Sequence, residues 1–305
     1  MNACHINKAD DLVTPRPIIV EGFLEQIRMK RKEADKFVKK AKSVKGRLLN
    51  FSNESDLKSL FADNTIRDAL ISAAGVSEKA RKHLRENELD EVLKTWQPIF
   101  SGKKEDFFEE VLYRYLLTKG GSLTGSMNNI IGKRAEEEFR EIIIDALKAR
   151  GIKPDPRKSK SGRINRLKWD NRIIFINIKP KFIDKNIDFI VLDVSYSHHQ
   201  ERDLLEMPEA YLACGELKGG IDPAGGDEHW KTARSAFDRI VERFEKEKPD
   251  CPKLFFVGAA IGISMAEEIF DMLDRKKDTR IKLACAANLT KADQVQDLAK
   301  WIVSL

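Results

Sequence analysis

The sequence predicts an α/β protein of the α+β kind, in which a mixed β-sheet is flanked by helices and preceded by an N-terminal helical domain. Up to about residue 150, apolar residues recur at spacings of three and four, which is typical of amphipathic helices. After that point, short apolar runs with the length and composition of strands alternate with helical segments. The 305 residues, 42% of them hydrophobic, suffice for two packed parts. We therefore predict domains at residues 1–150 and 151–305.

The first part contains two clear amphipathic helices, at residues 105–119 and 128–150. Between them lies the sequence GGSLTGSM, at residues 120–127. Its glycine and hydroxyl residues predict a loop that separates the two helices.

The second part contains strand-like and helix-like segments in a regular order. Three strands come first, at residues 172–179, 188–195 and 211–218. Helices and strands then alternate, with helices at 227–248, 265–275 and 290–305 and strands at 253–260 and 281–288. This order indicates a mixed sheet flanked by helices. The basic stretch at residues 154–168 predicts a flexible connection between the two parts, one that becomes ordered on DNA.

The charge of the chain is unevenly distributed. The net charge is +6, yet residues 28–47 and residues 157–185 each carry a net charge of +8, which leaves the remainder at −10. Such polarity suits a protein that binds a polyanion through selected surfaces. A solvated helix and a disordered basic loop would give the same pattern, so each segment alone leaves both interpretations open.

The remaining composition points to the bacterial cytoplasm. No apolar run approaches the ~20 residues that a membrane span needs, and the N-terminus lacks the order of a signal peptide. We therefore expect no membrane partner. The four cysteines are scattered, without the spacing of a zinc site or of a disulfide framework, so reduced and mostly buried thiols are expected.

The segment YLACGELKGGIDPAGGDEHWKTA, at residues 211–233, contains the candidate chemistry. Side chains alternate along a strand, so Glu216 and Lys218 emerge on one face, just before a glycine-rich loop. Asp188 begins the neighbouring strand. If it lies beside them, two carboxylates and the backbone carbonyl of Leu217 supply oxygen ligands suited to Mg²⁺.

These residue types suit the hydrolysis of a phosphodiester, because an attacking water must lose a proton while negative charge grows on the phosphate. Lys218 can orient that water or help to deprotonate it. His229, near the start of the next helix, can accept a proton near neutral pH or only contact the phosphate. An acidic residue two positions before a lysine occurs three times in this chain. The pattern alone therefore leaves a surface ion pair at a strand end as an alternative.

Longer matches point to a known family. The segment GELKGGIDPAGGDEHWKTA resembles the catalytic segment of the AvaI/BsoBI family of type II restriction endonucleases. The sequences RYLLTKGGSLTGSMNNI, DKNIDF, GAAIGISMAEEIFD and ANLTKADQV also resemble that family, in the same order along the chain. The resemblance covers most of the chain and is weakest before about residue 50 and through residues 150–172.

The resemblance implies a restriction-endonuclease-like catalytic domain of the PD-(D/E)XK type, with a helical domain that embraces and recognises DNA. By position, Asp188, Glu216 and Lys218 take the metal and water roles, and His229 matches the additional active-site histidine of the family. Ile187 stands where the generic motif has a proline, a position without a chemical role.

Four further residues are candidates for reading DNA. Lys79 and Lys82, three residues apart on a helix, can donate to guanine, and Lys185 lies close to Asp188 in the chain. Asp222, in the loop after the catalytic strand, can accept from a cytosine amino group. From sequence alone, a solvated helix face is the commoner explanation of Lys79 and Lys82, and an Asp-Pro turn is the favoured explanation of Asp222. The resemblance favours contact with DNA.

The resemblance also implies a target and partners. Members of the family recognise CYCGRG in duplex DNA and leave four-base 5′ overhangs, so this chain is expected to cut that site or a close relative. A near-palindromic target implies a two-fold symmetric homodimer. A methyltransferase of the same system is expected without direct contact. A structure-specific or repair nuclease, and a DNA-binding protein without catalysis, remain the alternatives.

Overall fold

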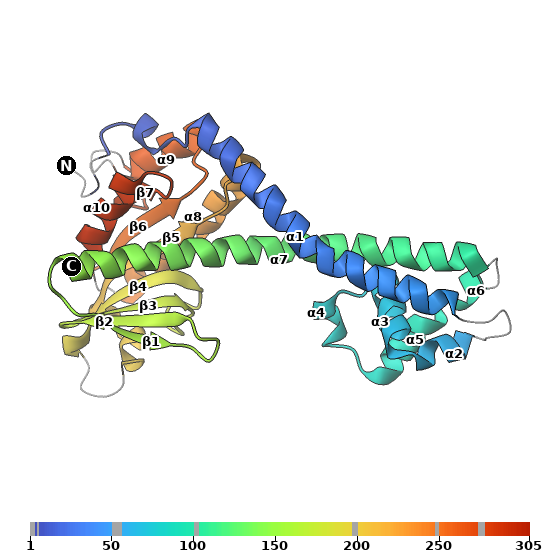
Figure 1. Ribbon diagram of the computed structural model, residues 1–305. Helices are drawn as coiled ribbons and strands as arrows, with labels where there is room; N and C mark the ends of the chain where they lie inside the picture. Colours follow the sequence, from blue (N-terminus) through green and yellow to red (C-terminus); the bar gives the residue numbers. More distant parts are fainter. Residues whose placement is uncertain are drawn as a thin grey trace. The chain divides into compact units, whose positions relative to one another are not determined.

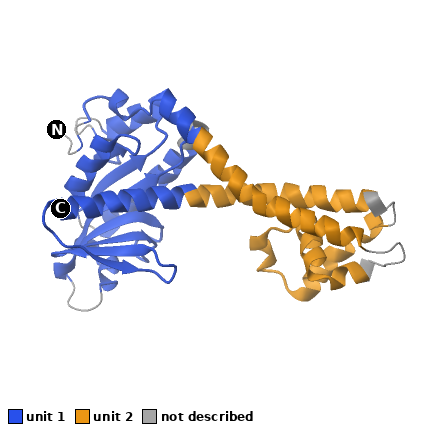
Figure 2. Cartoon of the chain, in the orientation of Figure 1, with its two compact units in different colours: residues 1–23, 131–305 blue, residues 24–130 orange. Residues whose placement is uncertain are grey.

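The computed structural model describes residues 4, 6–50, 57–100, 104–196, 201–247, 250–273 and 278–305 (Figure 1). The chain forms two compact units (Figure 2). One unit contains residues 1–23 and 131–305, and we call it the sheet unit. The other contains residues 24–130, and we call it the helical unit. Both division points fall inside long helices, α1 (Arg16–Leu49) and α7 (Lys104–Ala149).

The sheet unit is built on one seven-stranded sheet whose strands follow one another in chain order (Figure 1). The strands are β1 (Asp155–Lys158), β2 (Ile164–Trp169), β3 (Arg172–Ile178), β4 (Ile187–Asp193), β5 (Tyr211–Lys218), β6 (Lys253–Gly258) and β7 (Leu283–Asn288). Neighbours from β1 to β5 are antiparallel, whereas β5, β6 and β7 are parallel. The predicted mixed sheet with flanking helices is therefore confirmed.

Helices cover both faces of this sheet. They are the C-terminal part of α7, α8 (Pro223–Glu247), α9 (Ile263–Leu273) and α10 (Ala292–Val303). The α10 residue Trp301 packs on Phe255, with 5.9 Å between the ring centroids, and the α8 residue Trp230 packs on Phe256 at 5.0 Å. Adjacent strand residues point to opposite faces. Helices α10 and α8 therefore lie on opposite sides of the sheet.

The helical unit has a separate hydrophobic core. Besides parts of α1 and α7, it contains α2 (Leu57–Ala62), α3 (Asn64–Ala73), α4 (Glu78–Arg81), α5 (Glu86–Lys94) and α6 (Gln97–Phe100). The Asp63 carboxylate caps α3, because it accepts from the backbone N–H groups of Thr65 and Ile66. The indole of Trp96 is buried and donates to the Leu70 carbonyl at 3.0 Å. In the part of the chain that the structure describes, no helix combines the length and the apolar character that crossing a membrane requires.

The predicted loop at residues 120–127 is wrong, because these residues lie inside the continuous helix α7. A glycine costs a helix about 1 kcal/mol relative to alanine, but extending an existing helix avoids the unfavourable nucleation step. The hydroxyls of Ser122 and Thr124 donate to carbonyls four residues earlier, Thr118 and Gly120. Strong helix formers on both sides therefore outweigh the three glycines.

The predicted flexible connection at residues 154–168 is also wrong, because β1 and β2 form an antiparallel hairpin there. Gly162, with φ +80°, supplies the left-handed conformation that the turn requires. The apolar residues Leu167 and Trp169 are buried in the sheet unit, while the residues of β1 are exposed. Lysines and arginines are so frequent in this segment that its composition predicts a linker. The few buried apolar residues of β2 are a weaker signal in the sequence.

The expectation of reduced cysteines fails for one pair. Cys4 and Cys285 form a disulfide across 281 positions of the sequence, and Cys4 lies in the N-terminal segment that packs beside β7. Cys214 and Cys251 are free. The spacing of the cysteines does not predict this pairing, because only tertiary packing brings the two segments together.

Candidate active site

The candidate site lies where β4 begins and β5 ends. These antiparallel strands pair Phe189 with Gly215, and this register sets Asp188 opposite Glu216. Next to that pair, the Leu217 N–H donates to a side chain instead of to the backbone of β4. Its acceptor is Oδ2 of the Asp188 carboxylate, at 2.8 Å. The two strand ends thus hold both acids at one point.

Lys218 joins the two acids. Its Nζ lies 2.8 Å from Oε2 of Glu216 and 3.2 Å from Oδ2 of Asp188. The Lys218 side chain is 18% exposed and that of Glu216 only 4%, so the ion pairs are largely withdrawn from water. A surface ion pair at a strand end, the alternative interpretation, does not describe this cluster.

Burial shapes the electrostatics of the site. Burial, and then the negative charge of Asp188, raise the pKa of Glu216 to about 8, although Lys218 opposes the shift. Burial lowers the pKa of Lys218, but the charges of Glu216 and Asp188 outweigh it, so the net shift of that pKa is upward. The lysine therefore stays charged, and the Glu216 carboxyl favours its protonated form until a further cation enters.

The residues present fit a divalent cation. Oε1 of Glu216 is buried and has no hydrogen-bond partner, which leaves one oxygen available as a ligand. In a strand, the N–H and C=O of one residue point to the same side, so the Leu217 carbonyl faces the side on which its N–H meets Asp188. The described residues contain no cluster of three or more acid, histidine or cysteine ligands. Two carboxylates and a carbonyl suit Mg²⁺, which keeps several waters.

His229 lies on α8, next to Trp230. The register of β5 and β6 pairs Glu216 with Phe256, and Trp230 packs on Phe256, so α8 covers the face that bears Glu216. His229 is half-buried, and a Cβ on Gly220 would lie 3.2 Å from its Nε2, so the ring lies against the loop after β5. Burial, and then the charge of Lys218, lower the pKa of His229.

Sequence reasoning missed one acid near the site. Glu136, on α7, has a raised pKa because of its burial and then because of the charge of Asp188. Asn177, in a left-handed conformation with φ +54°, donates to Oε2 of Glu136 at 3.4 Å. The segment GKRAEEEF gives no signal for Glu136, because three consecutive glutamates resemble a solvated helix face.

The four candidate DNA-reading residues occupy different elements. Lys185 is partly buried in the turn before β4, and Asp222 is exposed just before α8. Both belong to the sheet unit. Lys79 is exposed on α4, and Lys82 is exposed at the C-cap of the same short helix, in the helical unit.

A mixed sheet with two acids and a lysine at adjoining strand ends defines a restriction-endonuclease-like protein. The model of the family described as "Restriction endonuclease BsobI" matches residues 2–164 and 159–305. The type II restriction enzyme AvaI of a Nostoc species and that of Anabaena variabilis are each 38% identical to this chain, covering 99% of it and 98% of the relative. The type II restriction enzyme BsoBI of Geobacillus stearothermophilus is 34% identical over 99% of this chain and 97% of its own length. The chain belongs to the BsoBI restriction endonuclease family.

Proposed function

We propose that this protein is a type II restriction endonuclease, which hydrolyses phosphodiester bonds of duplex DNA at a specific site with Mg²⁺. One observation carries the proposal: Lys218 contacts both Asp188 and Glu216, while a buried oxygen of Glu216 remains without a partner. Membership of the restriction endonuclease family supports it.

The proposed roles follow from the contacts. Asp188, Glu216 and the carbonyl of Leu217 would hold the cation, which when bound supplies a water of lowered pKa and offsets negative charge on the phosphate. Lys218 orients the attacking water through its Nζ, which already lies between the two carboxylates. His229 accepts a proton at its ring, because its lowered pKa keeps the imidazole neutral near pH 7.

We propose further that Lys79, Lys82, Lys185 and Asp222 contact the DNA. Lysines donate to guanine edges or to phosphates, and an aspartate accepts from the amino group of cytosine. The proposed target is CYCGRG or a close relative, with 5′ overhangs. In this proposal residues 1–150 embrace and recognise DNA and residues 151–305 carry the catalytic site.

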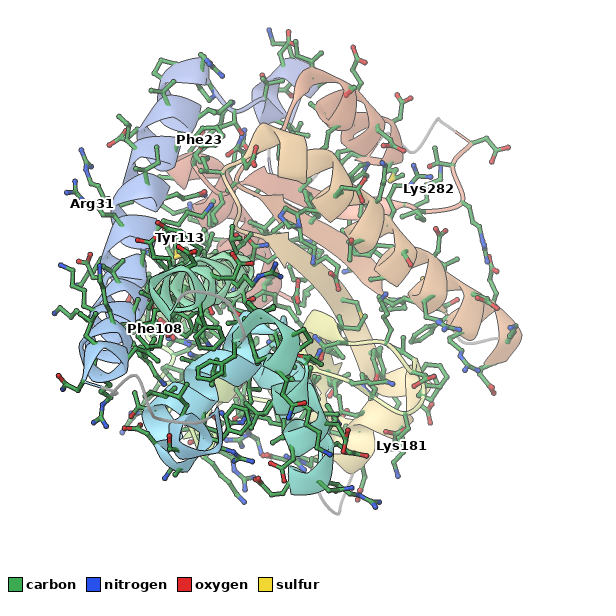
Figure 3. All side chains as sticks on the ribbon, turned by 90° about the vertical axis from the view of Figure 1, so that its right-hand side faces the viewer. Phe23, Arg31, Phe108, Tyr113, Lys181 and Lys282 are labelled. Atoms are coloured by element: carbon green, nitrogen blue, oxygen red, sulfur yellow. A yellow bond between two sulfur atoms is a disulfide. The ribbon has the colours of Figure 1, made fainter. Side chains whose placement is uncertain are left out.

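A homodimer in the bacterial cytoplasm is part of the proposal, because two copies read a near-palindromic site symmetrically. An exposed apolar face on α7 supports the dimer. Tyr113, Leu116 and Leu117, at i, i+3 and i+4, are 58%, 38% and 76% exposed, and Figure 3 labels Tyr113 on this helix. A methyltransferase would protect the same site in the DNA without contacting this chain.

The test is cleavage of plasmid DNA with sequencing of the ends. The proposal expects discrete fragments with Mg²⁺ when the plasmid carries CTCGAG, and intact plasmid when that site and its relatives are removed. Lys218→Ala should keep DNA binding and lose roughly 10²–10⁴-fold in cleavage rate. Lys300→Ala, at an exposed position of the same unit outside both basic segments, should cut normally.

Other outcomes distinguish the alternatives. Fragments that depend on flaps or mismatches rather than on sequence would select a structure-specific nuclease. DNA binding without any cleavage, over a range of DNAs and divalent cations, would select a non-catalytic DNA-binding protein.

A further inference from the structure

A polar pocket of about 320 Å³ lies within the helical unit. Its walls include Lys36 and Lys40 of α1, Glu78 of α4, and Tyr115, Lys119 and Ser126 of α7. None of these residues belongs to the candidate active site. The volume lies at the lower end of the range of roughly 300–1,000 Å³ that is typical of ligand pockets.

A buried hydroxyl in the wall has no partner. Tyr115 is 1% exposed, and its hydroxyl makes no hydrogen bond to the described residues. Native proteins satisfy nearly all buried polar groups, so the unpartnered hydroxyl of a residue in the pocket wall leaves one hydrogen bond for a ligand or an ordered water to complete. Burial, and then the charge of Glu78, raise the pKa of Tyr115, so the hydroxyl keeps its proton and can donate to an anion.

A buried lysine lies beside this tyrosine. The Lys119 side chain is 7% exposed, and its ammonium lies 5.7 Å from the ring centroid of Tyr115 and 5.9 Å from that of Phe37. These ring contacts fix the charge at the wall of the pocket. In the described structure, the only anion on this ammonium within 4.0 Å is the carboxylate of Glu78, at 2.8 Å.

Three ammonium groups act on that carboxylate. The hydrogen bond and charge of Lys119, and then the charges of Lys40 and Lys36, lower the pKa of Glu78. Lys36 also pairs with Glu33, whereas Lys40 makes no ion pair within 4.0 Å among the described residues. The Glu78 side chain is 72% exposed, so it can leave the pocket without a large loss of packing.

We propose that this pocket binds a phosphate group and that Glu78 occupies the site as an internal competitor when no phosphate is bound. Lys40, Lys119 and the Tyr115 hydroxyl are the donors, and a phosphate offers them several acceptor oxygens on one centre. The phosphate comes either from a DNA backbone or from free phosphate in solution. The DNA source rests on the proposed function, whereas binding of free phosphate does not.

The test observes Tyr115 directly. The chain has four tyrosines, so protein labelled with 3-fluorotyrosine gives a simple ¹⁹F spectrum in which Tyr115→Phe assigns the resonance. The full-length protein is titrated, without divalent cation, with inorganic phosphate in one series and with a duplex carrying CTCGAG in the other. A saturable shift with the duplex alone identifies a backbone phosphate as the ligand, and a shift with inorganic phosphate identifies a free one. Absence of a shift in both series overturns the proposal.

Two matched pairs of variants test the roles of the side chains. Glu78→Gln removes the competitor and should tighten phosphate binding several-fold, a gain that a misfolded variant cannot produce. Glu91→Gln makes the same charge change in the same unit and should leave affinity unchanged. Lys40→Gln should weaken binding and reduce the salt slope of duplex affinity by about 0.9, the value for one lost phosphate contact. Lys94→Gln, at an exposed lysine of α5 in the same unit and outside the basic segment of α1, is its control.

Each result separates this inference from the proposed function. A protein that cuts CTCGAG while Tyr115 stays unperturbed retains the nuclease proposal and loses the phosphate pocket. A protein that binds phosphate at Tyr115 without cutting any DNA retains the pocket and loses the nuclease proposal. Equal affinities of Glu78→Gln and Glu91→Gln would contradict the role of Glu78 as a competitor.

Discussion

Glu216 is the residue on which the proposed chemistry most depends. Oε2 accepts from Lys218, while Oε1 is buried without a partner. An ionised carboxylate in this position is costly until a cation pairs with its second oxygen, since burial and Asp188 both disfavour its charge. Protonation of Glu216 and binding of a cation should therefore compete.

The first prediction concerns stability and pH without divalent cations. The pKa of Glu216 rises from 4.5 to about 8 on folding, so the folded chain binds more protons than the unfolded chain between those values. The contribution of Glu216 to the free energy of unfolding should therefore fall as pH rises from about 5 to about 8. Urea denaturation in the presence of a chelator measures it. Glu216→Gln should remove this dependence, whereas Glu209→Gln, at an exposed position, should keep it.

A second prediction concerns divalent cations and the same residue. Mg²⁺ should restore stability near pH 8 in the parent protein, because it would pair with the ionised carboxylate. The same addition should have little effect on Glu216→Gln. Equal stabilisation of the two proteins would place the cation elsewhere.

A third prediction concerns His229. Its pKa is lowered by burial and by Lys218, so a base at this position is neutral at pH 7 and becomes charged only in more acid solution. His229→Ala should lower the single-turnover cleavage rate by roughly 10²–10⁴-fold at neutral pH, and added imidazole should restore part of it. Cleavage at the parent rate would remove the histidine from the mechanism.

Among the elements, the contact between the end of β5 and helix α7 sets the position of the site. A Cβ on Gly219, the residue after β5, would lie only 2.2 Å from the Cβ of Ala135. This close approach lets α7 bring Glu136 to the site, where the charge of Asp188 acts on it. Gly219 has no positive φ, so the backbone conformation does not require a glycine here. The close packing against α7 does.

The fourth prediction tests this contact with a double mutant. Gly219→Ala should lower the free energy of unfolding by about 1–3 kcal/mol, because the added methyl group overlaps with α7. Ala135→Gly removes the opposing methyl group, so the double variant should be more stable than Gly219→Ala alone. Gly262→Ala, where a Cβ meets no atom within 4 Å, is the control for adding a methyl group. Chemical denaturation measures the parent protein and the four variants, and a double variant no more stable than Gly219→Ala would contradict the overlap.

At the scale of the whole molecule, an exposed basic surface and an exposed apolar face bear on the choice of partners. Basic residues of α1 are exposed, and Figure 3 shows Arg31 extending outward from this helix. The apolar face of α7 formed by Tyr113, Leu116 and Leu117 is exposed as well. The first surface suits a polyanion and the second a protein partner.

The fifth prediction concerns the homodimer. Leu117→Asp places a charge in the apolar face of α7, so it should shift the protein from dimer to monomer in sedimentation experiments. Double-strand cleavage should fall with the dimer, because each copy reads half of the target. Leu49→Asp, at another exposed leucine, should leave the protein dimeric in the same experiment. A dimer that survives Leu117→Asp would exclude this face as the interface.

Sequence periodicity determined most of the secondary structure. The strand at residues 211–218 has the bounds of β5, because its apolar run is compact and ends at glycines. The alternation along this strand also predicted that Glu216 and Lys218 share a face, and the contact of 2.8 Å agrees. Such features depend on neighbours in the chain, so local pattern is enough to predict them.

Only the tertiary structure decided which distant residues meet. The bond from Leu217 to Asp188, the approach of Glu136 and the disulfide between Cys4 and Cys285 all join segments that no local pattern connects. The same holds for residues 120–127, where flanking helices override a local preference for a loop. The physical reason is that these outcomes depend on packing, burial and the cooperativity of long elements, which arise only when the whole chain folds.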